Sequence, residues 1–232
     1  MIPEQPKRII NLQFETPEQL ALKLSSIEPR LSCGPMKIKL PISLFQHLID
    51  ITDAELAEKT HDLTHGIVAR VYKGKGSFQI KDRLSEDFVK FLIECSEHYK
   101  ELLGINNSLK NKSDMPPLQL DNVWTISQES GDYNPLHWHF GKLSGVIYLK
   151  VPQQIIDGNA EKARMFGGSG HSLDGKMEFI YWPSHPFSYF STGSGTITPI
   201  EGDMYIFPAW LPHTVYPFSG EGERRIVSFN MI

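Results

Sequence analysis

The chain has 232 residues, 40% of them hydrophobic and 22% charged, with a formal net charge of −4, a composition ordinary for a globular protein of one large domain. It shows no Lys/Arg stripe, no apolar run long enough for a membrane span and no apolar stretch typical of a secretory signal near its N-terminus, so we expect no nucleic-acid or membrane partner. Its two cysteines lie far apart, which favours a reducing compartment, and we expect a cytoplasmic protein.

The first half of the chain is predicted to be mixed, with helices prominent. Between 41 and 50, apolar residues recur at helical spacing. A second helical piece is expected from Thr52, with Thr52 as its cap and Glu55 completing a capping box.

The clearest predicted helix begins near Ser85. Its apolar stripe continues as far as Leu102, and Gly104 is the expected residue that ends it. The polar stretch 106–117 ends in two prolines and is interpreted as a linker. We therefore divide the chain into an N-terminal mixed or helical region, 1–117, which packs on a core formed by 118–232.

The second half is predicted to be rich in β-strands. Short runs of β-branched and aromatic residues alternate with turn residues, a pattern typical of a sandwich or a jelly roll. The glycine-rich stretch 157–175 interrupts them and is interpreted as a long loop that could act as a lid. The expected strands are 122–127, 143–151, 176–182, 195–200, 203–207, 213–216 and 225–230.

Two histidines stand one residue apart in this half. If the segment around them is extended, His137 and His139 point to the same side and can hold one metal, while Trp138 points away. The simpler alternative is two polar residues on a solvated face. A further histidine, His213, follows a proline-bounded turn in an apolar setting, where an imidazole needs a partner that a metal would supply.

Two consecutive arginines stand at the start of the last predicted strand, Arg224 directly before it and Arg225 as its first residue. Alternation places Arg224 on one face and Arg225 on the other. A buried arginine there would need an anion, and a dicarboxylate would suit its planar fork, whereas an exposed one would be an ordinary surface charge.

These pieces occur in a specific order: His-x-His, a Ser-Gly-Val-x-Tyr strand, Gly-Asp-x-x-x-Phe-Pro, a His five residues after that Pro, and Arg on the final strand. In this order they resemble the 2-oxoglutarate/Fe(II)-dependent oxygenase superfamily, and most of all a marine bacterial and phage branch related to prolyl hydroxylases. The resemblance spans about 124–230. It implies a mostly β fold with flanking α-helices, namely a double-stranded β-helix (a cupin-like jelly roll).

The resemblance also implies roles for single residues. His137 and His213 match metal ligands, and Arg224 matches the basic residue that binds the far carboxylate of 2-oxoglutarate, with Arg225 as the alternative. Tyr148 matches a tyrosine that hydrogen-bonds the same carboxylate.

The third metal ligand departs from the pattern of the superfamily, because His139 stands where a carboxylate is usual. We favour His139 as a true third ligand. The alternatives are a carboxylate from elsewhere, such as Asp132, Asp157 or Glu178, and a position left to water or an anion. Trp124, Trp138, Phe207 and Trp210 could form apolar walls around the site.

The expected function is therefore a 2-oxoglutarate-dependent dioxygenase that uses Fe(II), 2-oxoglutarate and O2 to hydroxylate an unknown substrate, with a prolyl or other protein residue as one option. One alternative is a three-His cupin-type metalloenzyme that does not use 2-oxoglutarate. The other is a non-catalytic phage or viral jelly-roll protein. A homodimer is the assembly that we consider.

Overall fold

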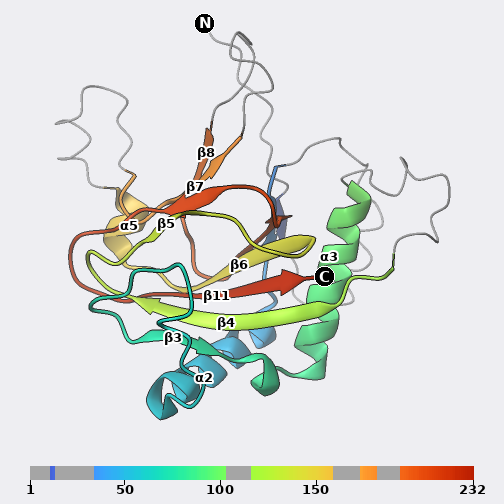
Figure 1. Ribbon diagram of the computed structural model, residues 1–232, viewed down its shortest axis with the longest axis horizontal. Coiled ribbons are helices and arrows are strands. Elements are labelled where there is room, and N and C mark those ends of the chain that lie inside the picture. The colour runs from blue at the N-terminus through green and yellow to red at the C-terminus, as the bar shows by residue number, and fades with distance from the viewer. Residues whose placement is uncertain (1–10, 14–33, 103–115, 159–172, 182–193) are drawn as a thin grey trace, which may run out of the picture.

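Two β-sheets packed face to face, with the two long helices on the outer side of the larger sheet, make up the protein in this computed structural model (Figure 1). The structure describes residues 11–13, 34–102, 116–158, 173–181 and 194–232. Its helices are α2 (Ile42–Glu58), the 3-10 helix η1 (Lys81–Arg83), α3 (Glu86–Leu102) and α5 (Gln153–Asp157). Its strands are β1 (Asn11–Gln13), β2 (Met36–Lys39), β3 (Gly76–Gln79), β4 (Leu120–Gln128), β5 (Asn134–His137), β6 (Leu143–Lys150), β7 (Met177–Ile180), β8 (Ser194–Ile197), β9 (Asp203–Pro208), β10 (His213–Val215) and β11 (Arg224–Met231).

The order of the strands defines a double-stranded β-helix. The larger sheet runs β1-β2-β9-β6-β11-β4-β3 and the smaller one β5-β10-β7-β8. From β4 onward the chain crosses between the sheets, so that β4, β6, β9 and β11 lie in one and β5, β7, β8 and β10 in the other. All pairings among these eight strands are antiparallel, as in a jelly roll, and this confirms the predicted fold class.

The N-terminal part contributes to both the sheet and its cover. β2 and β3 extend the larger sheet by pairing with β9 and β4. Helix α3 lies across the outer face of this sheet, and α2 lies beside it (Figure 1). The division of the chain at residue 117 stays a prediction.

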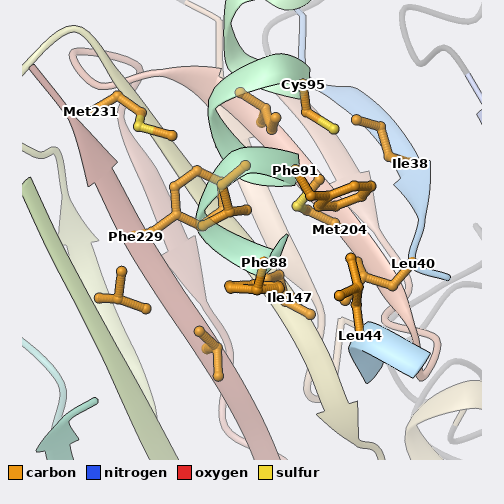
Figure 2. Close-up of a cluster of buried hydrophobic side chains, with 14 of the residues drawn as sticks. Ile38, Leu40, Leu44, Phe88, Phe91, Cys95, Ile147, Met204, Phe229 and Met231 are labelled. Carbon is orange, nitrogen blue, oxygen red and sulfur yellow. The ribbon is translucent and has the colours of Figure 1, made fainter. Parts of the chain in front are cut away.

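A large apolar cluster joins these helices to the sheet. Phe88, Phe91 and Cys95 of α3 are fully buried against the larger sheet. The sheet residues in this cluster include Ile147 of β6 and Phe229 of β11 (Figure 2). Each large side chain removed from water here contributes roughly 1.5–3 kcal/mol to folding. The predicted apolar stripe of α3 is therefore confirmed, and the Ser85 hydroxyl caps the helix by accepting a hydrogen bond from the Phe88 N–H at 3.3 Å.

The prediction of two helical pieces around Thr52 was wrong. Helix α2 is continuous through this position, and the Thr52 hydroxyl donates to the carbonyl oxygen of Leu48 at 2.7 Å instead of capping a new helix. A threonine within a helix often bonds back to the preceding turn in this way. Glu55, the supposed capping-box residue, is turned toward Thr60 and Arg83.

Gly145 explains the glycine in the Ser-Gly-Val-x-Tyr motif. A Cβ atom at this position would lie 2.2 Å from the Phe229 ring and 2.9 Å from the carbonyl oxygen of Tyr205. No side chain fits there without moving two neighbouring strands. The glycine therefore serves the packing of the sheet.

A second apolar cluster fills the space between the two sheets, and it includes Ile126, Phe179 and Phe218. All seven predicted strands are present within the described residues, although 176–182 and 195–200 are shorter than expected. Gly104, most of the 106–117 linker and most of the 157–175 segment lie outside the described residues, so the predicted lid stays a prediction. No described helix has the length and apolar character needed to cross a membrane.

Candidate metal and co-substrate site

A cavity of about 590 Å³ lies between the two sheets. The predicted metal ligands His137, His139 and His213 line this cavity. The predicted co-substrate residues Tyr148 and Arg224 line the same cavity. Residues 87 positions apart thus line one cavity, because the pair β5-β10 belongs to one sheet, the pair β6-β11 belongs to the other, and the cavity lies between the sheets.

The backbone holds the three histidines in place. His137 ends β5 and stands directly opposite His213, the first residue of β10, in an antiparallel register. His139 lies two residues beyond β5, where its N–H donates to the carbonyl oxygen of Ala209 at 2.9 Å. Trp138 between them is 64% exposed and so points away from the cluster core, as the alternation predicted.

The three imidazoles form one compact cluster. One ring nitrogen from each histidine lies within 4.8 Å of the other two. The Nε2 atoms of His139 and His213 are 3.3 Å apart, and the ring centroids of His137 and His213 are 4.2 Å apart. Nitrogens that bind one metal ion at about 2.1 Å stand roughly 3.0–3.4 Å from each other, so the separation of the His139 and His213 nitrogens suits a shared metal ion.

Two of these rings have their outer nitrogen engaged by the backbone. The Nδ1 of His137 lies 2.7 Å from the carbonyl oxygen of Pro135, and the Nδ1 of His213 lies 2.9 Å from that of Leu211. A carbonyl can only accept, so Nδ1 carries the proton and Nε2 keeps its lone pair for a metal.

The environment favours the neutral, metal-binding form of each ring. Burial lowers the pKa of His137, although hydrogen bonds to the backbone partly oppose it. Burial and the nearby His137 lower the pKa of His139 to about 4. Burial, with the neighbouring His137, holds the pKa of His213 well below its usual value. All three are neutral at pH 7, as metal binding requires.

No carboxylate joins the cluster among the described residues. Asp132 uses both carboxylate oxygens to accept backbone N–H groups, among them those of Tyr72 and Gly74. Glu178 accepts from the hydroxyl of Tyr216, and Asp157 accepts from Gln153 on the surface of α5. The donor set that the structure offers to a metal is thus three neutral nitrogens, a set that suits Fe, Zn, Cu or Ni.

Arg224 is a buried cation in the same cavity. It is 1% exposed, and burial lowers its pKa to about 10, so it remains charged at neutral pH. No carboxylate of the described residues forms an ion pair with it. A buried guanidinium without a counterion is an attractive place for an anion.

Arg225 lies on the opposite face of β11. Its guanidinium contacts Asp53 of α2, and its Nε donates to Glu223 at 2.8 Å. It is therefore already paired on the helix side of the sheet, away from the cavity. The structure brings Arg224 and not Arg225 to the histidines' chamber.

Tyr148 lies deep in the cavity. Its hydroxyl points to the sulfur of Met177 at 3.6 Å, a weak acceptor, and its ring is 2% exposed. Burial raises the pKa of its phenol, which is a neutral hydrogen-bond donor. Of the four expected wall residues, Trp124, Trp138 and Phe207 line the cavity and Trp210 does not. Trp138 is 64% exposed, so only Trp124 and Phe207 give the cavity covered apolar walls.

Sequence reasoning missed two polar residues of the cavity. Gln128 and Asn134 are 1% and 6% exposed, and the Gln128 amide donates to the Asn134 side-chain oxygen at 2.9 Å. The available signal was alternation, because Gln128 shares a strand face with Trp124 and Ile126.

Fold and site together describe a jelly roll whose cavity has three histidines placed to hold one metal ion and a buried arginine suited to an anion. Residues 122–230 match the family described as "Putative 2OG-Fe(II) oxygenase". This part of the chain contains the β-helix and all the predicted site residues. The match covers a little under half of the chain, and it makes this region similar to a family of oxygenases named for their use of Fe(II) and 2-oxoglutarate.

Solved structures align with most of the chain at low identity and with TM-scores under 0.5. A prolyl-4-hydroxylase from Pseudomonas putida is 15% identical, with a TM-score of 0.48 over 92% of this chain and 97% of that one. A 2OG-Fe(II) oxygenase family oxidoreductase from Burkholderia pseudomallei is 12% identical, with a TM-score of 0.49 over 95% and 94%. A viral collagen prolyl hydroxylase from Paramecium Bursaria Chlorella virus-1, in a 2OG complex, is 15% identical, with a TM-score of 0.45 over 85% and 94%. No curated protein matches the chain.

Proposed function

We propose that His137, His139 and His213 hold the Fe(II) ion of a 2-oxoglutarate-dependent hydroxylase, and that Arg224 and Tyr148 bind the far carboxylate of 2-oxoglutarate. One observation carries this proposal: a cluster of three imidazoles and a buried guanidinium that forms no direct ion pair among the described residues line the same 590 Å³ cavity. The first suits a metal ion and the second an anion of the co-substrate's kind.

When bound, Fe(II) and 2-oxoglutarate supply the oxidation: O2 is consumed, 2-oxoglutarate becomes succinate and CO2, and one oxygen atom passes to the substrate. The chain's own residues prepare for it. The backbone carbonyls of Pro135 and Leu211 orient two imidazoles with Nε2 toward the cluster. Arg224 anchors the anion by charge, and Tyr148 donates its O–H to the same group. Trp124 and Phe207 contribute apolar walls that exclude water.

A prolyl or other protein residue as the substrate stays a prediction. A homodimer and a cytoplasmic location also stay predictions. The Trichoplax adhaerens prolyl hydroxylase, whose structure contains a hypoxia inducible factor peptide, has a TM-score of only 0.47 to this chain. It therefore lends no argument for a peptide substrate.

A second candidate is a three-His metalloenzyme that does not use 2-oxoglutarate. Two observations favour it: no carboxylate among the described residues joins the cluster, and the N–H groups of Arg224 already have neutral acceptors. In that case, removing the charge of Arg224 would leave metal-dependent activity intact.

The test is turnover with purified, Fe(II)-loaded protein. The proposal expects O2-dependent conversion of 2-oxoglutarate to succinate that is lost in His213→Ala and in Arg224→Met. Succinate release that persists at the wild-type rate in Arg224→Met would reject the assigned co-substrate site. Metal binding without any turnover of 2-oxoglutarate would favour the second candidate.

A further inference from the structure

Gln128 and Arg224 form a cross-strand pair inside the cavity. Gln128 ends β4 and stands directly opposite Arg224, the first residue of β11. The Gln128 side-chain oxygen accepts from Arg224 Nη2 at 2.8 Å and from Nε at 3.2 Å. One amide oxygen thus faces the Nε/Nη2 edge of the guanidinium, where a carboxylate would bind side-on.

The remaining N–H groups of Arg224 are held by the main chain. Nη1 donates to the carbonyl oxygens of Gly175 and Tyr216 at 3.0 and 2.9 Å, and Nη2 lies 3.4 Å from that of Asp132. All five donors of the guanidinium therefore have an acceptor. Among these acceptors only Gln128 is a side chain, so it is the one that can rotate away without moving the backbone.

Gln128 is a neutral partner for Arg224, whereas a carboxylate would be a charged one. An amide oxygen satisfies the hydrogen bonds of a buried guanidinium but supplies no charge, and the Asp132 carboxylate acts on Arg224 only from a distance, without a direct ion pair. An incoming carboxylate offers the same bonds and the missing charge, and charge-assisted bonds are roughly twice as strong as neutral ones. Exchange of the amide for an anion is thus favourable at this edge.

We propose that Gln128 is a placeholder for the far carboxylate of the co-substrate: it occupies the Nε/Nη2 edge of Arg224 in the ligand-free protein and leaves that edge when the anion binds. This inference rests on the proposed function, because it takes the anion to be 2-oxoglutarate. It makes Gln128 a positioning residue that sets co-substrate affinity.

Asn134 orients the Gln128 side chain. Its side-chain oxygen accepts from the Gln128 amide at 2.9 Å, and it lies on β5 three residues before His137. This bond fixes which end of the Gln128 amide faces Arg224. Asn134 can flip its own amide and donate instead, so a carboxylate at position 128 would also find a donor there.

Two substitutions at this position should act in opposite directions. Gln128→Glu builds a permanent carboxylate into the Nε/Nη2 edge, which gives Arg224 an internal counterion. The metal-free variant should melt about 2–4 °C above the wild type, and the affinity of the Zn(II)-loaded variant for 2-oxoglutarate should fall at least about tenfold. Gln128→Met removes the competing oxygen, so the metal-free protein should melt lower and bind 2-oxoglutarate a few-fold more tightly.

The measurements are thermal unfolding of the metal-free proteins and calorimetric titration of the Zn(II)-loaded proteins with 2-oxoglutarate. Gln79→Glu is the matched control, because it adds the same charge to the same cavity beside Asn122 rather than beside Arg224. The control should change 2-oxoglutarate affinity much less than Gln128→Glu.

Each outcome separates the inference from the proposed function. Weaker 2-oxoglutarate binding in both Gln128 variants would mean that Gln128 only holds Arg224 in position, and it would overturn the proposal. Wild-type affinity in Gln128→Glu would overturn it as well. Wild-type protein that binds no 2-oxoglutarate would instead reject the co-substrate assignment, while opposite shifts in melting temperature would still support the exchangeable amide.

Discussion

The Nε2 atoms of His139 and His213 lie 3.3 Å apart although 74 residues separate them in the chain. Because the Nδ1 of His213 is engaged by the Leu211 carbonyl, its Nε2 presents a lone pair to His139. His139 can meet this lone pair in either of two neutral forms: its Nε2–H tautomer donates a hydrogen bond to His213, and its Nδ1–H tautomer leaves both Nε2 lone pairs facing a shared cation. The pKa values of both rings are lowered, so neither is an imidazolium at pH 7, and the Nδ1–H tautomer of His139 is the form that binds a metal through Nε2.

Changing His139 tests the three-His centre directly. His139→Ala should weaken metal binding at least about tenfold, because it removes one of three ligands. His139→Asp should keep one metal per chain but lower the stability of the metal-free protein by about 1–3 kcal/mol, since it buries a carboxylate without a cation. Metal titration followed by thermal unfolding measures both effects, and wild-type affinity in His139→Ala would remove this residue from the ligand set.

The two arginines of β11 should separate binding from stability. Arg224→Met should weaken 2-oxoglutarate binding by about 10–100-fold, because a charge-assisted contact is lost. Arg225→Met should leave that affinity unchanged and cost about 1–3 kcal/mol of unfolding free energy, since it breaks the ion pairs with Glu223 and Asp53. Calorimetry and urea unfolding measure the two quantities, and the reverse pattern would exchange the assigned roles.

Tyr148→Phe removes one hydroxyl from the cavity. The variant should bind 2-oxoglutarate about 5–10-fold more weakly, because one hydrogen bond of about 1 kcal/mol disappears. Its stability should change by less than about 0.5 kcal/mol, since the hydroxyl only contacts the Met177 sulfur in the free protein. Unchanged affinity would mean that the carboxylate does not reach Tyr148.

Acid stability should depend on Glu55, which is fully buried in α2. Burial alone raises the pKa of its carboxyl, but hydrogen bonds from Thr60 and the His61 N–H, with the charge of Arg83, outweigh burial and hold the pKa below its usual value. The unfolded chain therefore takes up this proton first as the pH falls. The stability that Glu55 contributes is complete above about pH 4.5 and is lost as the pH falls through the lower folded-state pKa.

Glu55→Gln should cost about 1–3 kcal/mol at pH 7 and flatten the stability profile at acid pH. Urea unfolding between pH 3 and 7 provides the measurement, and Glu58→Gln is the control, because Glu58 also contacts Arg83 but is largely exposed. Parallel pH profiles for Glu55→Gln and the wild type would contradict this account.

The β-helix was predictable for two reasons. Turn residues separate its strands clearly, and the site motifs follow one another along the chain in a distinctive order. The strands β2, β3 and β5 were missed as strands because each has only four residues, and their pairing partners lie far away in sequence. Short strands depend on tertiary pairing more than on local propensity.

In the site, alternation placed His137 and His139 on one side and separated Arg224 from Arg225 without saying which arginine meets the cavity. Both faces of β11 are buried, one under the helices and one between the sheets, so polarity does not mark the inner face. The role of Gln128 could not be predicted either, because its partner lies 96 residues away.

The most direct test of the three-His oxygenase is an anaerobic titration of the metal-free protein with Fe(II) and then with 2-oxoglutarate. We expect one Fe(II) per chain, followed by a visible charge-transfer absorption that appears only when both are present and is absent in His213→Ala. Fe(II) binding without this absorption at saturating 2-oxoglutarate would contradict the account, because the co-substrate would then not bind at the metal.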